Sequence, residues 1–284
     1  MDARGLLALF ALTAATSGQE RLLQRTDLPA RAAAAARIDR TLEREHGLAT
    51  TIALAATGGS ALPIGSRARG VLTEALRRAN RSDDDARALA RLRLDLGELV
   101  DTLVFEPVAE AELPKGLPTY VGLDEVELRT YPAYRMARTA MKAGGSNGAF
   151  WPLFNHIKDN GIAMTSPVQM DYDAAGRRAA SMAFLYGDPT TDPKAVGDAV
   201  EVVDVPAATV LSIGANGSER KARIAAMEQR LRAFVEASGG TWVVVGPLRT
   251  MGYNSPMVRG DQRYFEVQLP VARAERGGRA GDAR

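Results

Sequence analysis

The sequence predicts an α+β protein in which a helical N-terminal region precedes a domain built from two β-β-α-β-β units. Three observations lead to this fold class. Residues before about position 106 are rich in Ala, Leu and Arg at helical spacing, residues after about position 124 contain short β-like runs, and those runs recur as an internal repeat. Two such units bury their apolar faces best by joining their sheets, so we expect a distorted antiparallel β-barrel with two flanking helices.

The first 18 residues resemble a secretory signal peptide. An apolar run at residues 6–15 follows Arg4, and the small residues Ser17 and Gly18 come after it. The run is too short to span a bilayer, and no later segment has 18 continuous apolar residues. We therefore expect residues 1–18 to direct export to the periplasm or the exterior. The alternative is a cytoplasmic protein in which this run begins a buried helix.

Residues 19–106 are predicted to be helical. The clearest helix begins at Ser82 or Asp83 and ends near Val104, because acidic residues stand at its start, where the helix dipole favours them. Its leucines recur at steps of three and four residues and share one face: Leu89, Leu92, Leu96, Leu99 and Leu103. Two further helices are predicted over residues 30–44 and 69–79. Together these helices indicate a small bundle, or alternatively an arm that binds a protein partner.

A linker is predicted at residues 107–123 and a disordered tail at residues 272–284, which leaves residues 124–271 as the α+β domain. The tail has no apolar periodicity. The linker is rich in residues that interrupt regular structure, namely Pro107, Pro114, Gly116 and Pro118.

Two segments of the domain repeat. A Val-Glu-Leu run at residues 126–128 precedes Pro132, and a Val-Glu-Val run at residues 200–202 precedes Pro206 with the same spacing. In each copy a second strand, a Gly-containing break and a helix follow, and a Ser-Pro pair and a closing strand complete the unit. We therefore expect a cleft between two related halves, because such junctions are frequent ligand sites.

The helix of the first unit, at about residues 149–158, is unusually apolar. Pro152 lies close to its start, where a missing N–H costs least. Its large side chains point in nearly all directions: Phe150, Trp151, Leu153, Phe154 and Ile157. One sheet face cannot cover so much apolar surface, so we expect part of it to line a pocket for a small hydrophobic ligand.

Composition and motifs exclude several other kinds of site. The chain has no Cys and two His, which excludes disulfides, thiolate zinc sites, Cys nucleophiles and polyhistidine metal sites. The 36 basic and 34 acidic residues are too balanced to argue for nucleic acid. The sequence contains neither a phosphate-binding loop nor a plausible Ser-His-Asp order. We therefore expect a binding protein that is not an enzyme.

The order of the motifs resembles the SOUL haem-binding protein family over residues 124–270. The Pro132 strand motif and the aromatic helix are followed by Met164-Thr165-Ser166-Pro167-Val168 and later by Gly252-Tyr253-Asn254-Ser255-Pro256-Met257. The resemblance implies a distorted β-barrel flanked by two helices, and binding of haem or another tetrapyrrole. Carried over to this sequence, it implies a pocket formed by Phe150, Leu153, Phe154, Ile157, Met164, Tyr253 and Met257.

The residues that would bind the iron and the propionates match the family pattern less well than the apolar residues do. Some members of the family carry a His before the Tyr of the first strand motif, and this chain has Thr130 there. His156, on the aromatic helix, is the candidate axial haem ligand instead, and the alternative is that it is an ordinary, half-exposed helix residue. Lys158 or Arg259 would pair with a propionate as an exposed ion pair contributing ~1 kcal/mol.

The sequence thus predicts a carrier, buffer or sensor of haem or another tetrapyrrole. One alternative is an effector-type module for another hydrophobic small molecule, because duplicated β-β-α-β-β units also serve that purpose. A second alternative is an interaction protein in which the N-terminal helices bind the partner and the barrel is a scaffold.

Overall fold

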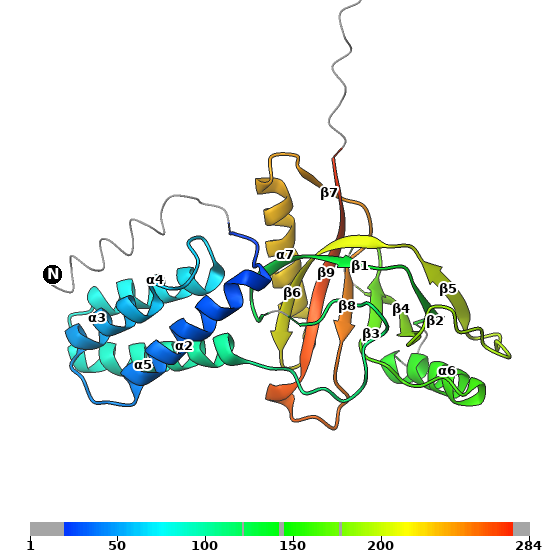
Figure 1. The fold of residues 1–284 in the computed structure, drawn as a ribbon, viewed down its shortest axis with the longest axis horizontal. Coiled ribbons are helices and arrows are strands. Elements are labelled where there is room, and N and C mark those ends of the chain that lie inside the picture. Colours follow the sequence, from blue (N-terminus) through cyan, green and yellow to red (C-terminus); the bar gives the residue numbers. More distant parts are fainter. Residues whose placement is uncertain (1–19, 121, 142–144, 176–177, 275–284) are drawn as a thin grey trace, which may run out of the picture.

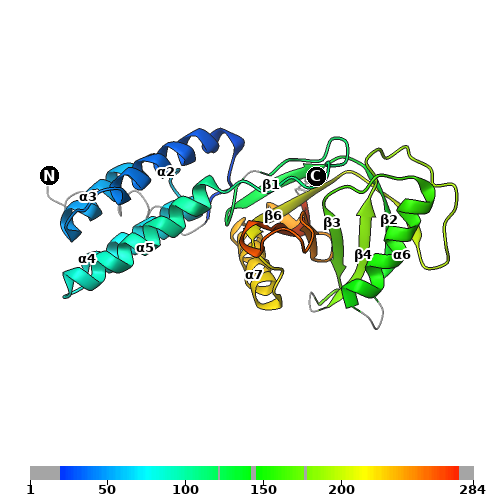
Figure 2. The same ribbon diagram turned by 90° about the horizontal axis from the view of Figure 1, so that it is seen from below.

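A computed structural model describes residues 20–120, 122–141, 145–175 and 178–274. The predicted signal peptide lies outside these residues, as does the predicted tail beyond Ala274. The described part contains a helical region and a curled antiparallel sheet with two helices, and it is therefore α+β as predicted. The two regions lie side by side along the long axis of the molecule (Figures 1 and 2).

Four α-helices follow the short η1 (Arg25–Asp27) and form the helical region: α2 (Leu28–Leu42), α3 (Leu48–Gly59), α4 (Arg67–Asn80) and α5 (Asp85–Val104). The predicted leucine stripe of α5 is confirmed, since Leu92, Leu96 and Leu99 are buried in the core between the helices. The side chain of Asp84 accepts a hydrogen bond from the backbone N–H of Arg87 and caps α5, as its acidic start indicated. Helix α3 was not predicted, although Ile52, Ala55 and Ala56 pack into the same core.

Nine strands and two helices make up the remainder: β1 (Val126–Tyr131), β2 (Tyr134–Ala140), α6 (Gly145–Asn160), β3 (Val168–Tyr172), β4 (Ala179–Leu185), β5 (Glu201–Val205), β6 (Ala208–Asn216), α7 (Lys221–Ala237), β7 (Trp242–Val244), β8 (Arg249–Gly252) and β9 (Tyr264–Arg273), with the short η2 (Gly260–Gln262) before β9. The strand order is β1-β6-β9-β8-β3-β4-β2-β5, and β7 extends the sheet beside β9. All of the pairings between these strands are antiparallel.

The sheet is a curled half-barrel, so the predicted distorted antiparallel β-barrel is confirmed as a curled antiparallel sheet. Its two ends, β1 and β5, pair with β6 and β2 and not with each other. Val126 pairs with Ile213, Tyr131 with Ala208, Tyr134 with Val205 and Arg138 with Glu201, so one register continues across both proline turns. Hence β1–β2 and β5–β6 are two long bent strands that cross the open side of the sheet together (Figure 1).

Helices α6 and α7 cover one face of the half-barrel. Helix α6 packs on β2 and β4 at the end far from the helical region, and α7 packs on β6 and β9 nearer to it (Figure 2). The strand residues beneath them are apolar, as Ala137, Phe184, Leu211 and Val267 illustrate. Alternate residues point to the opposite face, which is called the inner face below.

The segment predicted as a linker lies across this inner face. Residues 105–120, called the strap below, contain no helix or strand. Leu117 is buried in one apolar cluster with Tyr131, Tyr134 and Met251 of the inner face. The strap therefore covers the half-barrel as well as connecting it to α5.

Candidate ligand-binding site

The buried side of α6 belongs to the core of the half-barrel. Leu153 and Ile157 are 0% and 4% exposed and pack with Met182 and Phe184 of β4. Both residues were predicted to line the ligand pocket. The structure places them in the contact between α6 and the sheet, because a helix on a sheet must bury one apolar stripe.

The aromatic residues of α6 lie along one flank of that buried stripe. Phe150 and Phe154 stack with ring centroids 5.8 Å apart, and Trp151 meets the edge of each ring. Trp151 is 59% exposed, and Lys158, one turn after Phe154, is exposed as well. This flank therefore offers an open aromatic surface with a cation beside it.

A groove lies along the opposite flank of α6. It has a volume of about 570 Å³ and runs between the helix and residues 194–200. Pro152, Val196 and Val200 give it apolar walls, and His156 and Lys194 are the basic residues that line it. The volume falls within the usual range of sites for small molecules, roughly 300–1,000 Å³.

His156 is held firmly in the wall of this groove. It is 6% exposed, its Nε2 lies 2.7 Å from the hydroxyl of Tyr186, and its Nδ1 lies 3.4 Å from the side-chain nitrogen of Asn160. Burial lowers the pKa of His156, although Asp159 opposes the shift, so the ring is neutral near pH 7. In the tautomer whose Nε2–H donates to Tyr186, Nδ1 carries the lone pair, and a ligand that uses it replaces the 3.4 Å contact with Asn160.

The other predicted residues lie elsewhere. Met164 is 37% exposed after α6, and Met257 is 88% exposed in the loop before β9. Tyr253 lies at the inner face, where its hydroxyl donates to Glu266 over 3.0 Å. The structure therefore distributes the nine predicted residues among the helix core, the two flanks of α6, the exposed loops and the inner face.

The inner face contains a buried polar network that the sequence analysis missed. Glu266 is fully buried and accepts hydrogen bonds from five side chains: Arg129, Ser212, Tyr253, Tyr264 and Gln268. Arg129, also buried, donates through Nη1 to Glu266 over 2.6 Å and through Nη2 to the strap carbonyls of Pro118 and Thr119. Burial and the charge of Glu266 raise the pKa values of Tyr253 and Tyr264, so both hydroxyls remain donors.

Glu127 lies beside this network with an unsatisfied carboxyl group. It is 3% exposed, and its Oε1 has no hydrogen-bond partner among the described residues. Burial raises its pKa to about 8, although Arg129 opposes the shift. The folded protein therefore keeps this proton up to about pH 8, whereas the unfolded chain releases it near the ordinary value of 4.5.

Glu127 thus makes the stability of the fold depend on pH. Between these two pKa values the folded state binds more protons, so stability falls as the pH rises. In urea titrations, we expect Glu127→Gln to raise the free energy of unfolding by roughly 2–4 kcal/mol relative to wild type at about pH 9. At about pH 4 we expect no such gain in stability. Glu112→Gln, at an exposed site, is the control. An equal effect of Glu127→Gln at both pH values would contradict this assignment.

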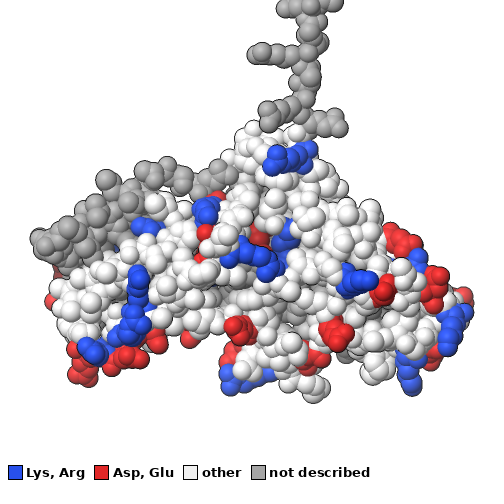
Figure 3. Space-filling model, viewed as in Figure 1, with Lys and Arg blue, Asp and Glu red and all other residues white. Residues whose placement is uncertain are grey.

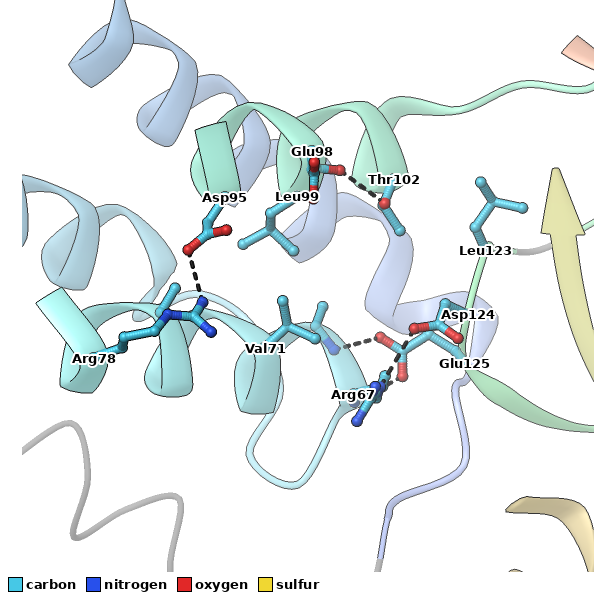
Figure 4. Close-up of a pocket in the computed structure, with 12 residues that line it drawn as sticks. Arg67, Val71, Arg78, Asp95, Glu98, Leu99, Thr102, Leu123, Asp124 and Glu125 are labelled. Atoms are coloured by element: carbon cyan, nitrogen blue, oxygen red, sulfur yellow. Dashed lines mark hydrogen bonds and ion pairs between the residues drawn. The ribbon is translucent and has the colours of Figure 1, made fainter. Parts of the chain in front are cut away.

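A smaller cavity lies where the helical region meets the half-barrel. It has a volume of about 280 Å³ between α4, α5 and the residues just before β1. Figure 4 shows Arg78 paired with Asp95 at one end, Arg67 beside Asp124 at the other, and Val71 between them. Both signs of charge occur at its rim, and they also intermix over the face shown in Figure 3.

None of the described helices is long and apolar enough to cross a bilayer. No curated protein matches the sequence. Among solved structures, the C-terminal domain of EcmrR shares 13% identity over 52% of this chain and 98% of its own, with a TM-score of 0.43. A hydrolase from Listeria innocua shares 13% identity over 54% of this chain and 94% of its own, with a TM-score of 0.41.

The family resemblance drawn from the motifs is confirmed. Residues 117–270, more than half of the chain, match the family described as SOUL heme-binding protein. The match begins within the strap and ends within β9, so it includes α6, both Ser-Pro motifs and the inner face. The chain belongs to the SOUL heme-binding protein family.

Proposed function

We propose that this protein binds haem or another tetrapyrrole reversibly and acts as a carrier, buffer or sensor, without enzymatic activity. Membership of the SOUL heme-binding protein family supports the ligand class. The observation that carries the proposal is the groove of about 570 Å³ beside His156. Its apolar walls suit the face of a macrocycle, and reversible binding needs no catalytic group.

His156 is the proposed axial ligand within this groove. Histidine ligands usually donate their second ring N–H to a nearby acceptor, which fixes the tautomer and the ring orientation. The hydrogen bond between Nε2 and Tyr186 matches that arrangement and leaves Nδ1 for the iron. Lys194, exposed at the groove, is placed to pair with a propionate, a contribution of ~1 kcal/mol or less. When bound, haem would supply an iron centre that can bind small ligands or electrons.

The aromatic flank of α6 is the second proposed position for the macrocycle. Phe150, Trp151 and Phe154 present ring faces and edges to solvent, and a porphyrin has a large flat apolar face to stack on them. Lys158 would then pair with the propionate. This position uses more of the residues implied by the family resemblance, whereas the groove provides the histidine.

We also propose that the two halves of the sheet arose by duplication. The order β1-β2-α6-β3-β4 is followed by β5-β6-α7, the short β7, and β8-β9. The uninterrupted register between β1–β2 and β5–β6 supports a twofold relation. If the halves arose by duplication, the groove at α6 is a feature that developed in the first half only.

Haem titration of purified protein tests the function and distinguishes the two positions. We expect haem to give a saturable shift of the Soret band with the wild-type protein. Val196→Glu should lower the affinity about tenfold or more, because it places a charge in the apolar groove. His156→Ala should change the position of the Soret band of the bound haem. Val243→Glu, on the exposed part of β7, is the matched control and leaves binding unchanged. A loss in Trp151→Ala with Val196→Glu unaffected would move the site to the aromatic flank. A Soret shift no larger than the one that haem gives in buffer alone, or with a protein that does not bind it, would reject haem binding.

An effector-type module for another hydrophobic small molecule is the second candidate function. Thr130, where some members of the family have a His, favours a ligand that needs no iron ligation from the first strand. Metal-free protoporphyrin and a lipophilic cation, each competed against haem, separate the candidates. Displacement by the cation with no preference for porphyrin would favour this second function.

A further inference from the structure

Arg249 is a buried cation on the inner face without a carboxylate partner. It is 6% exposed, and among the described residues no carboxylate oxygen lies within ion-pair distance of it. Its Nε donates to Gln268 over 2.9 Å, its Nη1 donates to the hydroxyl of Tyr134 over 3.0 Å, and its guanidinium lies over the ring of Tyr131. Its Nη2 has no acceptor among the described residues. Asp171 stands opposite Arg249 in the β3–β8 pairing, but its carboxylate accepts from Gln169 and Ser181 and forms no ion pair with the guanidinium. Buried charges are normally paired directly, so the guanidinium lacks a contacting anion.

An apolar cluster, called the chamber below, lies next to Arg249 and includes Leu117 of the strap. Tyr131, Tyr134 and Met251 belong to one cluster with Leu117, which is 7% exposed. The two tyrosines of this cluster are the ones that contact the guanidinium of Arg249. Leu117 therefore packs in the same cluster as the two tyrosines that contact the cation, and its side chain cannot neutralise the charge.

The strap is fastened mainly by polar contacts. Arg129 holds the carbonyls of Pro118 and Thr119 at 2.7 and 3.0 Å. At the other end, Ser255 donates to the carboxylate of Glu110 through its backbone N–H and its hydroxyl, and both residues are exposed. The contacts of Glu110 are exposed and contribute little to stability, whereas those of Arg129 are part-buried. The Glu110 end is therefore the weaker attachment, and no residue of the strap takes part in the strand pairing beneath it.

We propose that the inner face is a second ligand site, for a molecule with an apolar body and one carboxylate. The carboxylate pairs with Arg249, and the apolar body replaces Leu117 when the strap lifts. In the empty protein the strap closes the chamber and keeps water from the apolar walls. The two Ser-Pro motifs take part in the closure, because Ser166 donates from its backbone N–H to the carbonyl of Glu112, and Ser255 binds Glu110. This site is separate from both haem positions proposed on α6.

The test compares two probes of the same shape, naphthalene-2-carboxylate and its neutral carboxamide, by isothermal titration calorimetry. In the variant Leu117→Ala with Glu110→Ala, which loosens the strap, we expect the carboxylate to bind about tenfold or more tightly than to wild type and about tenfold more tightly than the carboxamide. Leu113→Ala, a strap residue outside the cluster, is the matched control and leaves affinity unchanged.

Arg249→Met tests the role of the charge and removes the preference for carboxylate over carboxamide. Hydrogen exchange of the strap amides in wild type is the second readout, because the carboxylate should accelerate it and the carboxamide should not. Equal binding of the two probes in the strap variant, or binding of neither with the fold intact by circular dichroism, overturns the proposal and leaves Arg249 a structural residue. Haem affinity is measured in Arg249→Met as well and should equal that of wild type, so the failure of one site does not imply failure of the other.

Discussion

Glu266→Gln lowers the free energy of unfolding by about 3–5 kcal/mol, the usual cost of removing one partner from a buried ion pair. Glu266 is 0% exposed, and its two carboxylate oxygens accept five hydrogen bonds. An amide in its place turns one acceptor into a donor that faces other donors, and it leaves Arg129 without its counter-charge. In wild type, burial lowers the pKa of Arg129 and the charge of Glu266 raises it by more. Arginine remains protonated in proteins, so the variant keeps a buried guanidinium whose nearest carboxyl group is Glu127, 3.7 Å away.

Urea unfolding followed by circular dichroism measures this loss. Glu201→Gln is the matched control, because Glu201 also pairs with an arginine, Arg138, but is 64% exposed in its side chain. We expect the control to change stability by less than about 1 kcal/mol. A cost for Glu266→Gln as small as that of the control would show that the inner-face network contributes little to the fold.

Local sequence patterns predicted where the helices and strands lie better than they predicted which face of each one is buried. The leucines of α5 and the acidic cap at Asp84 identify that helix because both signals act within a few residues. The strands were found for the same reason. Polar residues alternate along two of these strands, as Arg129 and Glu266 illustrate, and such alternation alone is typical of a face in contact with water. The structure buries that face beneath the strap, and nothing local in β1 or β9 records a cover that comes from residues 105–120.

The strap shows why amino-acid composition alone does not distinguish a flexible linker from a segment that packs on a sheet. Its prolines and glycine are typical of a flexible connection, and they also suit an extended segment that lies on a surface without forming a strand. A flexible linker and a packed segment differ only in contacts with residues far away in the sequence. In the strap, these contacts include Ser255 with Glu110 and Arg129 with the carbonyl of Pro118.

The candidate site was predictable to the level of one helix. The aromatic composition of α6 correctly indicated that one sheet face would not cover it, since Trp151 is 59% exposed. The sequence could not assign its residues to the core or to either flank, because Phe150, Leu153 and Ile157 are chemically alike. The groove beside His156 depends on residues 194–200, which carry no recognisable motif.

The junction of the helical region with the half-barrel contains a buried ion pair, and Arg31→Met should lower the free energy of unfolding by about 3–5 kcal/mol. Arg31 of α2 is 2% exposed and donates to Glu125, which is 1% exposed just before β1. Glu125 also accepts the backbone N–H groups of Arg67 and Ala68 at 2.9 and 3.0 Å and so caps the start of α4 from the half-barrel side. Removing the guanidinium leaves this carboxylate with backbone donors alone.

A double-mutant cycle separates the ion pair from the cap. Arg67→Ala, which breaks an exposed pair with Asp124, is the control and should cost less than about 1 kcal/mol. Arg31→Met combined with Glu125→Gln should cost less than the sum of the single variants, because the double variant buries no unpaired charge. If the costs simply add, the two side chains do not interact energetically, and the orientation of the helical region on the half-barrel must depend on apolar packing around Leu123 instead.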